Sequence, residues 1–227
     1  MRTKKIALFI QSESKMNRPH VIINCAMSLD GKIASPSGKQ MKISCEEDIK
    51  RMYELRNESD AVLVGIGTVL SDDPKLTVKE KYVKKPKQPT RIVLDTDCKT
   101  PVDALVVNDA TKTLIITGKD CNKKYLKNVE VIKCKTTDEG LIDLENLIKI
   151  LTEKGIKKLM VEGGSTVIGN FLKTGFVDDL FVYVAPIIVG GKNTPTLVKN
   201  IDENISLKLV ETKKIGPGIL LHFRLIK

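Results

Sequence analysis

Short β-branched and aliphatic runs alternate with longer amphipathic stretches along the chain from residue 20 onward. Such alternation is typical of an α/β domain built on a largely parallel sheet. Two further runs, Leu207–Ile215 and Ile219–Leu225, flank a Gly-Pro-Gly turn and predict a closing antiparallel hairpin. The runs that predict the other strands are Val21–Met27, Ala61–Gly65, Arg91–Asp95, Thr113–Thr117, Val129–Lys133, Lys158–Glu162 and Asp179–Ala185.

A first helix is predicted from its amino end. Ser44 and Glu47 have the spacing of a capping box, in which each side chain satisfies a backbone amide at the other residue. The helix that they open is expected to run to about Arg56.

Two later helices are predicted from their ends and their apolar stripes. One begins after Asp143, a residue type that caps helices, and stops at Gly155, which can take the left-handed conformation. The other begins at Ser165 and stops at Gly175. Their apolar faces are expected to pack into the core.

The chain of 227 residues is long enough to bury a sizeable core, and no linker or repeat divides it. We expect a single domain over residues 20–227, after an N-terminal extension at residues 1–19. The apolar runs are far shorter than the roughly 20 residues of a membrane-spanning helix. Residues 1–19 lack the apolar centre of a secretion signal, so a cytoplasmic location is expected.

The formal net charge of +10 raises the hypothesis of nucleic-acid binding, which the lysine-rich segment Lys79–Lys87 supports locally. Aromatic platforms for stacking bases are scarce, because the chain has four Tyr, five Phe and no Trp. Excess lysine also attracts phosphorylated metabolites. We therefore expect a small phosphorylated ligand, and neither nucleic acid nor a membrane as partner.

The five cysteines, Cys25, Cys45, Cys98, Cys121 and Cys134, are odd in number and lack the C-x-x-C spacing. This pattern indicates neither a disulfide framework nor a zinc site. Free thiols, buried or half-buried, are expected, and no metal.

Two glycines follow a predicted buried strand in Val161–Thr166 (VEGGST), directly before a predicted helix. The backbone amides of Gly163, Gly164 and Ser165 can approach an anion there, and the helix dipole favours negative charge. The segment therefore suits a diphosphate. A tight turn that needs glycine for its own conformation explains the same residues equally well.

A second strand end, in Val64–Thr77 (VGIGTVLSDDPKLT), also carries glycines. The third glycine of a G-x-G-x-x-G fingerprint is missing, which argues against an ordinary Rossmann site. Two glycine-bearing strand ends in one sheet instead predict a cofactor laid across the carboxyl edge. Asp72 and Asp73 suit either ligand contact or a turn before proline.

A third strand end, Asn24–Ala34 (NCAMSLDGKIA), places Lys32 after the turn-forming pair Asp30 and Gly31. The pair by itself indicates only a turn. A cation beside a hydride-transfer site can polarise an imine or carbonyl and hold a substrate oxygen. Lys32 is therefore a candidate catalytic residue.

Taken together, these motifs resemble the reductase family of riboflavin biosynthesis, whose fold is similar to that of dihydrofolate reductase. The resemblance covers residues 20–226 and implies a mostly parallel central sheet flanked by helices, a homodimer, and NADPH as cofactor. NADH stays possible, although Lys112, Lys119, Lys123 and Lys124 could meet a 2′-phosphate. The segments that carry the resemblance are Ser28–Ala34, Arg56–Asp60 with Ala61–Thr77, Arg91–Asp95, Leu159–Leu172 and Pro186–Gly191.

The resemblance also implies roles for individual residues. Lys32 and Glu162 are implied to lie near the reacting carbon. At Lys79 bacterial relatives usually have arginine, so a point charge replaces a bidentate phosphate ligand. The residues implied to contact the cofactor are Thr68, Asp72, Gly163, Gly164, Ser165 and Thr166, and those implied to line the substrate's ribose phosphate site are Ser44, Arg56, Leu76 and Lys79.

Bifunctional bacterial relatives carry a zinc deaminase domain with H-x-E and P-C-x-x-C motifs, which a chain with only His20 and His222 cannot build. The resemblance is therefore to the archaeal or fungal type, which reduces before deamination. It implies NADPH-dependent reduction of 2,5-diamino-6-ribosylamino-4(3H)-pyrimidinone 5′-phosphate to its ribitylamino form, by hydride transfer to C1′ of the ring-opened imine. A pteridine or dihydrofolate-type reductase and a basic nucleic-acid-binding domain are the alternatives.

Overall fold

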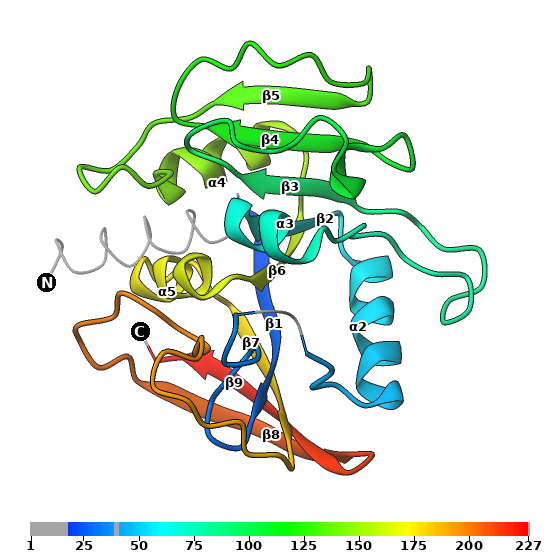
Figure 1. The fold of residues 1–227 in the computed structure, drawn as a ribbon, viewed down its shortest axis with the longest axis vertical. Coiled ribbons are helices and arrows are strands. Elements are labelled where there is room, and N and C mark those ends of the chain that lie inside the picture. Colours follow the sequence, from blue (N-terminus) through cyan, green and yellow to red (C-terminus); the bar gives the residue numbers. More distant parts are fainter. Residues whose placement is uncertain (1–17, 39–40, 227) are drawn as a thin grey trace, which may run out of the picture.

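The strands of the described residues, 18–38 and 41–226, form one nine-stranded sheet in this computed structural model. Figure 1 shows the spatial order β5-β4-β3-β2-β6-β1-β7-β9-β8 from top to bottom. Every predicted strand is confirmed, with ends that shift by at most one residue; Asp95, for example, lies just after β3 instead of within it. The strands are β1 (His20–Ser28), β2 (Ala61–Gly65), β3 (Thr90–Leu94), β4 (Thr113–Thr117), β5 (Val129–Lys133), β6 (Lys158–Gly163), β7 (Asp179–Ala185), β8 (Leu207–Ile215) and β9 (Gly218–Leu225).

The sheet is parallel from β5 to β7 and antiparallel where β9 pairs with β7 and with β8. The predicted closing hairpin is confirmed, because Ile215 pairs with Gly218 across a two-residue turn in which Gly216 has φ 53°. The central strand β2 is buried throughout, as expected for a parallel strand covered on both faces. Its carboxyl end therefore lies deep in the molecule, where a ligand can be enclosed.

Helices cover both faces of the sheet (Figure 1). The helices α4 (Leu144–Glu153) and α5 (Ser165–Lys173) share one core with alternate sheet residues such as Leu63, whereas α2 (Glu46–Glu58) and α3 (Ile66–Asp72) pack with Val62 on the other face. This alternation follows from the period of two along a strand. None of the helices in the described part of the chain is both long and apolar enough to cross a membrane.

Of two predicted helix starts, the one at Asp143 is confirmed and the one at Ser44 is not. Asp143 caps α4 as predicted, because its Oδ1 accepts from the amide of Asn146 at 3.0 Å. The predicted capping box is wrong: α2 begins at Glu46 with Cys45 as N-cap and no side-chain cap, so Ser44 lies one residue too early. The short helix α3 was not predicted, because seven residues that follow a strand directly show too little periodicity.

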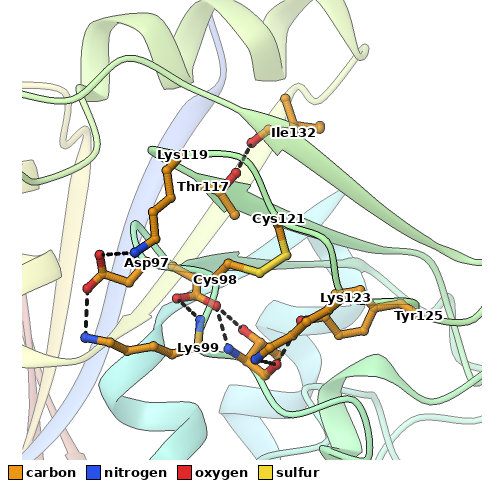
Figure 2. Close-up of a disulfide and its surroundings, with 11 residues drawn as sticks. Asp97, Cys98, Lys99, Thr117, Lys119, Cys121, Lys123, Tyr125 and Ile132 are labelled. Atoms are coloured by element: carbon orange, nitrogen blue, oxygen red, sulfur yellow. Dashed lines mark hydrogen bonds and ion pairs between the residues drawn. A yellow bond between two sulfur atoms is a disulfide. The ribbon is translucent and has the colours of Figure 1, made fainter.

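Two of the five cysteines are joined in a disulfide, Cys98 to Cys121, so the expectation of free thiols is wrong for this pair. Their Cα atoms lie 5.7 Å apart, within the usual range for a disulfide. Figure 2 shows the bond between the loops that follow β3 and β4. The sequence separation of 23 hid the pairing, which arises because β3 and β4 are neighbours in the sheet.

Candidate active site

The carboxyl ends of β2 and β6 lie side by side in the middle of the sheet. Their parallel register pairs Val64 with Gly163, and each strand runs directly into a helix, β2 into α3 and β6 into α5. The two glycine-bearing strand ends thus lie at one edge of the sheet, and the cofactor expected across this edge stays a prediction. Two strand-to-helix turns therefore face the same space.

Glycine is required in these turns for two reasons. Gly163 has φ 131°, which side chains rarely tolerate, so the turn conformation by itself accounts for this residue. A Cβ on Gly65 would lie 2.8 Å from Cγ2 of Val167, so the close approach of the two turns depends on its absence.

A cavity of about 500 Å³ opens beside the two turns. Gly163, which was also predicted to contact the cofactor, is buried in β6 and does not line it. Further lining residues, which the sequence did not single out, include Leu94, Thr96, Ile142 and Asn170. The predicted cofactor residues that do line the cavity are Thr68, Asp72, Gly164, Ser165 and Thr166.

The start of α5 offers backbone amides to an anion in this cavity. Gly164 is the N-cap of α5, and no side chain caps the helix. The Ser165 hydroxyl donates to the carbonyl of Thr196, so this residue presents its amide to a ligand instead of its hydroxyl. Uncapped amides and the positive end of the helix dipole favour a phosphate group. The residues present therefore fit a dinucleotide whose diphosphate lies at the start of α5.

A second cavity, of about 690 Å³, adjoins the first. Ile33 and Asp72 line both cavities, so two ligands would meet at these residues. Glu162 lines the second cavity from the end of β6. All the residues predicted for the substrate also line it: Ser44, Arg56, Leu76 and Lys79.

Glu162 is held by a bidentate ion pair with Arg56. Nε and Nη2 of Arg56 donate to Oε1 and Oε2 of Glu162 at 2.6 and 2.7 Å, and Nη1 donates to the Thr77 carbonyl at 3.0 Å. Burial alone would lower the pKa of Arg56, but the charge of Glu162 and its hydrogen bonds raise the pKa overall, so the guanidinium stays charged. Arg56 therefore orients Glu162 and has fewer donors left for a substrate phosphate.

Three lysines line the second cavity: Lys42, Lys75 and Lys79. No carboxylate of the described residues forms a salt bridge with any of them. Nζ of Lys79 lies 5.7 Å from the centre of the Tyr53 ring, a cation–π distance. Sequence reasoning identified Lys79 and missed Lys42 and Lys75, which lie in separate loops. Together they bring to this cavity three positive charges without a salt-bridge partner among the described residues, which suits a phosphate.

The two aspartates before Pro74 have separate roles. Asp73 has φ 41° and accepts from the amide of Leu105 at 2.8 Å, so it belongs to the turn that ends α3. Asp72 lines both cavities. The turn interpretation thus holds for Asp73, and ligand contact at Asp72 stays a prediction.

Asp30 in the SLDGKIA motif joins two loops. Its carboxylate accepts from the Ser28 hydroxyl at 2.6 Å and from the amides of Val189 and Gly190 at 3.1 and 2.7 Å. These bonds lower the pKa of Asp30 from 3.8 to about 2. The hydrogen bonds to ionised Asp30 therefore stabilise the folded protein fully above the ordinary pKa of 3.8. This stabilisation is lost as the pH falls toward about 2 and the carboxylate takes up a proton.

Lys32 follows this turn and lines neither cavity, although its neighbour Ile33 lines both. Its catalytic role stays a prediction. The lysines considered for a 2′-phosphate do not line the first cavity either. Lys112 pairs with Glu130 near the amino end of β4, and Lys119 pairs with Asp97 (Figure 2).

The family described as RibD C-terminal domain matches residues 19–221, and the chain belongs to this family. It is similar to the 2,5-diamino-6-ribosylamino-4(3H)-pyrimidinone 5′-phosphate reductase of Archaeoglobus fulgidus, with 38% identity over 91% of this chain and 98% of that protein. The protein of the same name from Methanothermobacter thermautotrophicus is 40% identical over the same shares of the two chains.

Among solved structures, the chain is similar to a diaminohydroxyphosphoribosylaminopyrimidine deaminase/5-amino-6-(5-phosphoribosylamino)uracil reductase from Thermotoga maritima. The TM-score is 0.80 at 28% identity, and the match covers 99% of this chain and 62% of that one. The fold is therefore of the dihydrofolate-reductase-like kind that the resemblance implied.

We expect Arg56→Met to lower the free energy of unfolding by about 3–5 kcal/mol, because Glu162 would stay buried without its partner. Urea unfolding followed by circular dichroism measures this loss. Lys158→Met, which breaks the more exposed pair with Glu58, is the control and should cost less than about 1 kcal/mol. Equal losses in the two variants would contradict the role given to Arg56.

Proposed function

We propose that the protein is an NADPH-dependent oxidoreductase that reduces 2,5-diamino-6-ribosylamino-4(3H)-pyrimidinone 5′-phosphate to its ribitylamino form. The observation that carries this proposal is the pair of adjoining cavities, one with an uncapped helix start and one with three unpaired lysines, that share Ile33 and Asp72. Relatives that this chain spans almost completely carry the name of this reaction.

The residues of the first cavity hold the cofactor in this proposal. Amides at the start of α5 bind the diphosphate, and Thr68 and Asp72 contact the part nearer the substrate. When bound, NADPH supplies the hydride that C1′ of the ring-opened ribosylamine accepts. The chain's own contribution is to place the two ligands end to end, because hydride transfer needs a separation of roughly 3–3.5 Å.

The residues of the second cavity bind the substrate. Lys42, Lys75 and Lys79 hold the 5′-phosphate as point charges. Glu162, fixed by Arg56, orients a substrate hydroxyl near the reacting carbon. Lys32 is the second candidate for a catalytic role and stabilises the ring-opened ribose.

Anaerobic assay of NADPH oxidation with the ribosylamino-pyrimidine phosphate tests the proposal, with NADH run beside it. We expect turnover with NADPH and a KM at least about tenfold higher for the dephosphorylated substrate, because the lysines then lose their partner. Turnover of dihydrofolate instead would favour a pteridine-type reductase. Steeply salt-dependent nucleic-acid binding without NADPH affinity would favour the nucleic-acid alternative.

The proposed catalytic residues are tested by Glu162→Gln and Lys32→Ala. We expect both to lower kcat/KM by at least about 100-fold, the usual worth of a group that acts at the reacting centre. Lys84→Ala, a change of an exposed lysine that lines neither cavity, is the control and should leave kcat/KM unchanged. A variant that keeps its full kcat/KM removes that residue from the mechanism.

We also propose a homodimer that uses the closing hairpin. The edge strand β8 exposes Leu209 and Val210, whose exposed fractions are 52% and 44%. Sedimentation should give about 50 kDa, twice the chain mass of 25.2 kDa. Val210→Lys should shift the protein to monomer, whereas Leu126→Lys, at a position 53% exposed beside β5, should not. A monomer in the unmodified protein would contradict the proposal.

A further inference from the structure

One buried carboxylate in the second cavity has no part in the reaction proposed above. Asp48 lies in the first turn of α2, is 3% exposed, and lines this cavity. Nε and Nη2 of Arg51 donate to it at 3.0 and 2.7 Å, and both bonds end on Oδ1. Its second oxygen, Oδ2, receives no hydrogen bond from the residues that the structure describes.

The Oδ2 atom of Asp48 is open to a ligand. Within residues 18–38 and 41–226, the fully buried side-chain polar atoms without a partner are the hydroxyls of Tyr183 and Thr194. Oδ2 of Asp48 is not among them, and no described residue donates a hydrogen bond to it. The second cavity is the space that Asp48 lines, so a ligand there can reach this oxygen.

Asp48 is also held in position. Nη2 of Arg51 donates to Oδ1 of Asn24 at 2.6 Å as well as to Asp48, so one guanidinium ties α2 to β1. The same guanidinium lies 5.8 Å from the centre of the Phe181 ring in β7. A carboxylate fixed through one oxygen by such a group presents the other oxygen in a constant direction, which selective recognition requires.

The other carboxylates of the cavity cannot take this role. Both oxygens of Glu162 accept from Arg56. Asp72 lies where the two cavities join, and so at the reacting end of the substrate. Asp48 is therefore the carboxylate available to the part of the substrate that is remote from the cofactor.

The relatives differ in the chemistry of the pyrimidine ring that their names give. The archaeal names specify a 2,5-diamino-pyrimidinone, whereas the Thermotoga name specifies a uracil. Carbon 2 therefore carries either an amino group, which donates hydrogen bonds, or an oxo group, which accepts them. An ionised carboxylate is an acceptor only, so it attracts the first and repels the second.

We propose that Oδ2 of Asp48 accepts a hydrogen bond from the 2-amino group of the pyrimidine, and that this contact selects the substrate before deamination. This inference rests on the proposed function and specifies its substrate class. Arg51 acts as a positioning residue, because it holds Asp48 through Oδ1. A ring with an oxo group at carbon 2 would instead place its carbonyl oxygen against Oδ2 of Asp48. Both atoms are acceptors, so neither would receive a hydrogen bond from the other.

The experiment compares kcat/KM for the 2-amino substrate and for its 2-oxo counterpart, in the unmodified protein and in Asp48→Asn. We expect the unmodified protein to prefer the 2-amino form by at least about 100-fold, because a site built to bind an N–H rejects an analogue that lacks it. Asp48→Asn should reduce this preference at least tenfold, since its amide can donate to the oxo group. Glu47→Gln, an exposed neighbour in α2 that lines neither cavity, is the matched control and should keep the preference.

Melting temperature and NADPH affinity report whether Asp48→Asn is folded, and Asp48→Ser takes its place if it is not. An unchanged preference in the folded variant would overturn the inference, as would equal or faster turnover of the 2-oxo form by the unmodified protein. The proposed function fails in a different way, namely through the absence of NADPH oxidation with either pyrimidine.

Discussion

The parallel pairing of β2 with β6 is the constraint on which the candidate active site depends. It brings two strand-to-helix turns together at the carboxyl edge, where Gly65 allows the turns to approach and Gly163 allows the positive φ of its own turn. Without this pairing, the start of α5 and the residues of α3 would not line one cavity. The site thus lies where parallel α/β sheets generally bind their ligands, beyond the carboxyl ends of central strands.

The charges around the second cavity divide into committed and uncommitted groups. Arg56 and Arg51 each form an ion pair with a carboxylate, whereas no carboxylate within residues 18–38 and 41–226 forms one with Lys42, Lys75 or Lys79. Planar guanidinium groups suit the fixed pairs, because they bind both oxygens or bridge two acceptors, and ammonium groups suit a flexible phosphate. The charged residues of this cavity thus include a rigid part, which orients Glu162 and Asp48, and a part whose positive charge suits a phosphate.

Elements with strong local signals were predictable, and elements formed by distant contacts were not. The strands stood out because buried parallel strands are nearly continuous apolar runs, and the cap at Asp143 is a local hydrogen bond. The helix α3 is too short for a periodic signal, and Cys98 and Cys121 meet only because β3 and β4 are adjacent. Ser44 and Glu47 have the spacing of a capping box, but the N-cap of α2 is Cys45, so the box does not form.

By itself the sequence determined the α/β class, the strands, the glycine turns and some of the residues that line the two cavities, because these follow from local patterns and ordered motifs. Only the tertiary structure decided that Arg56 binds Glu162, that Asp73 belongs to the turn after α3, and that Lys42, Lys75 and Asp48 line the second cavity. The reason is physical: an ion pair or a cavity joins residues far apart in the chain, and their distance depends on how the sheet folds them together.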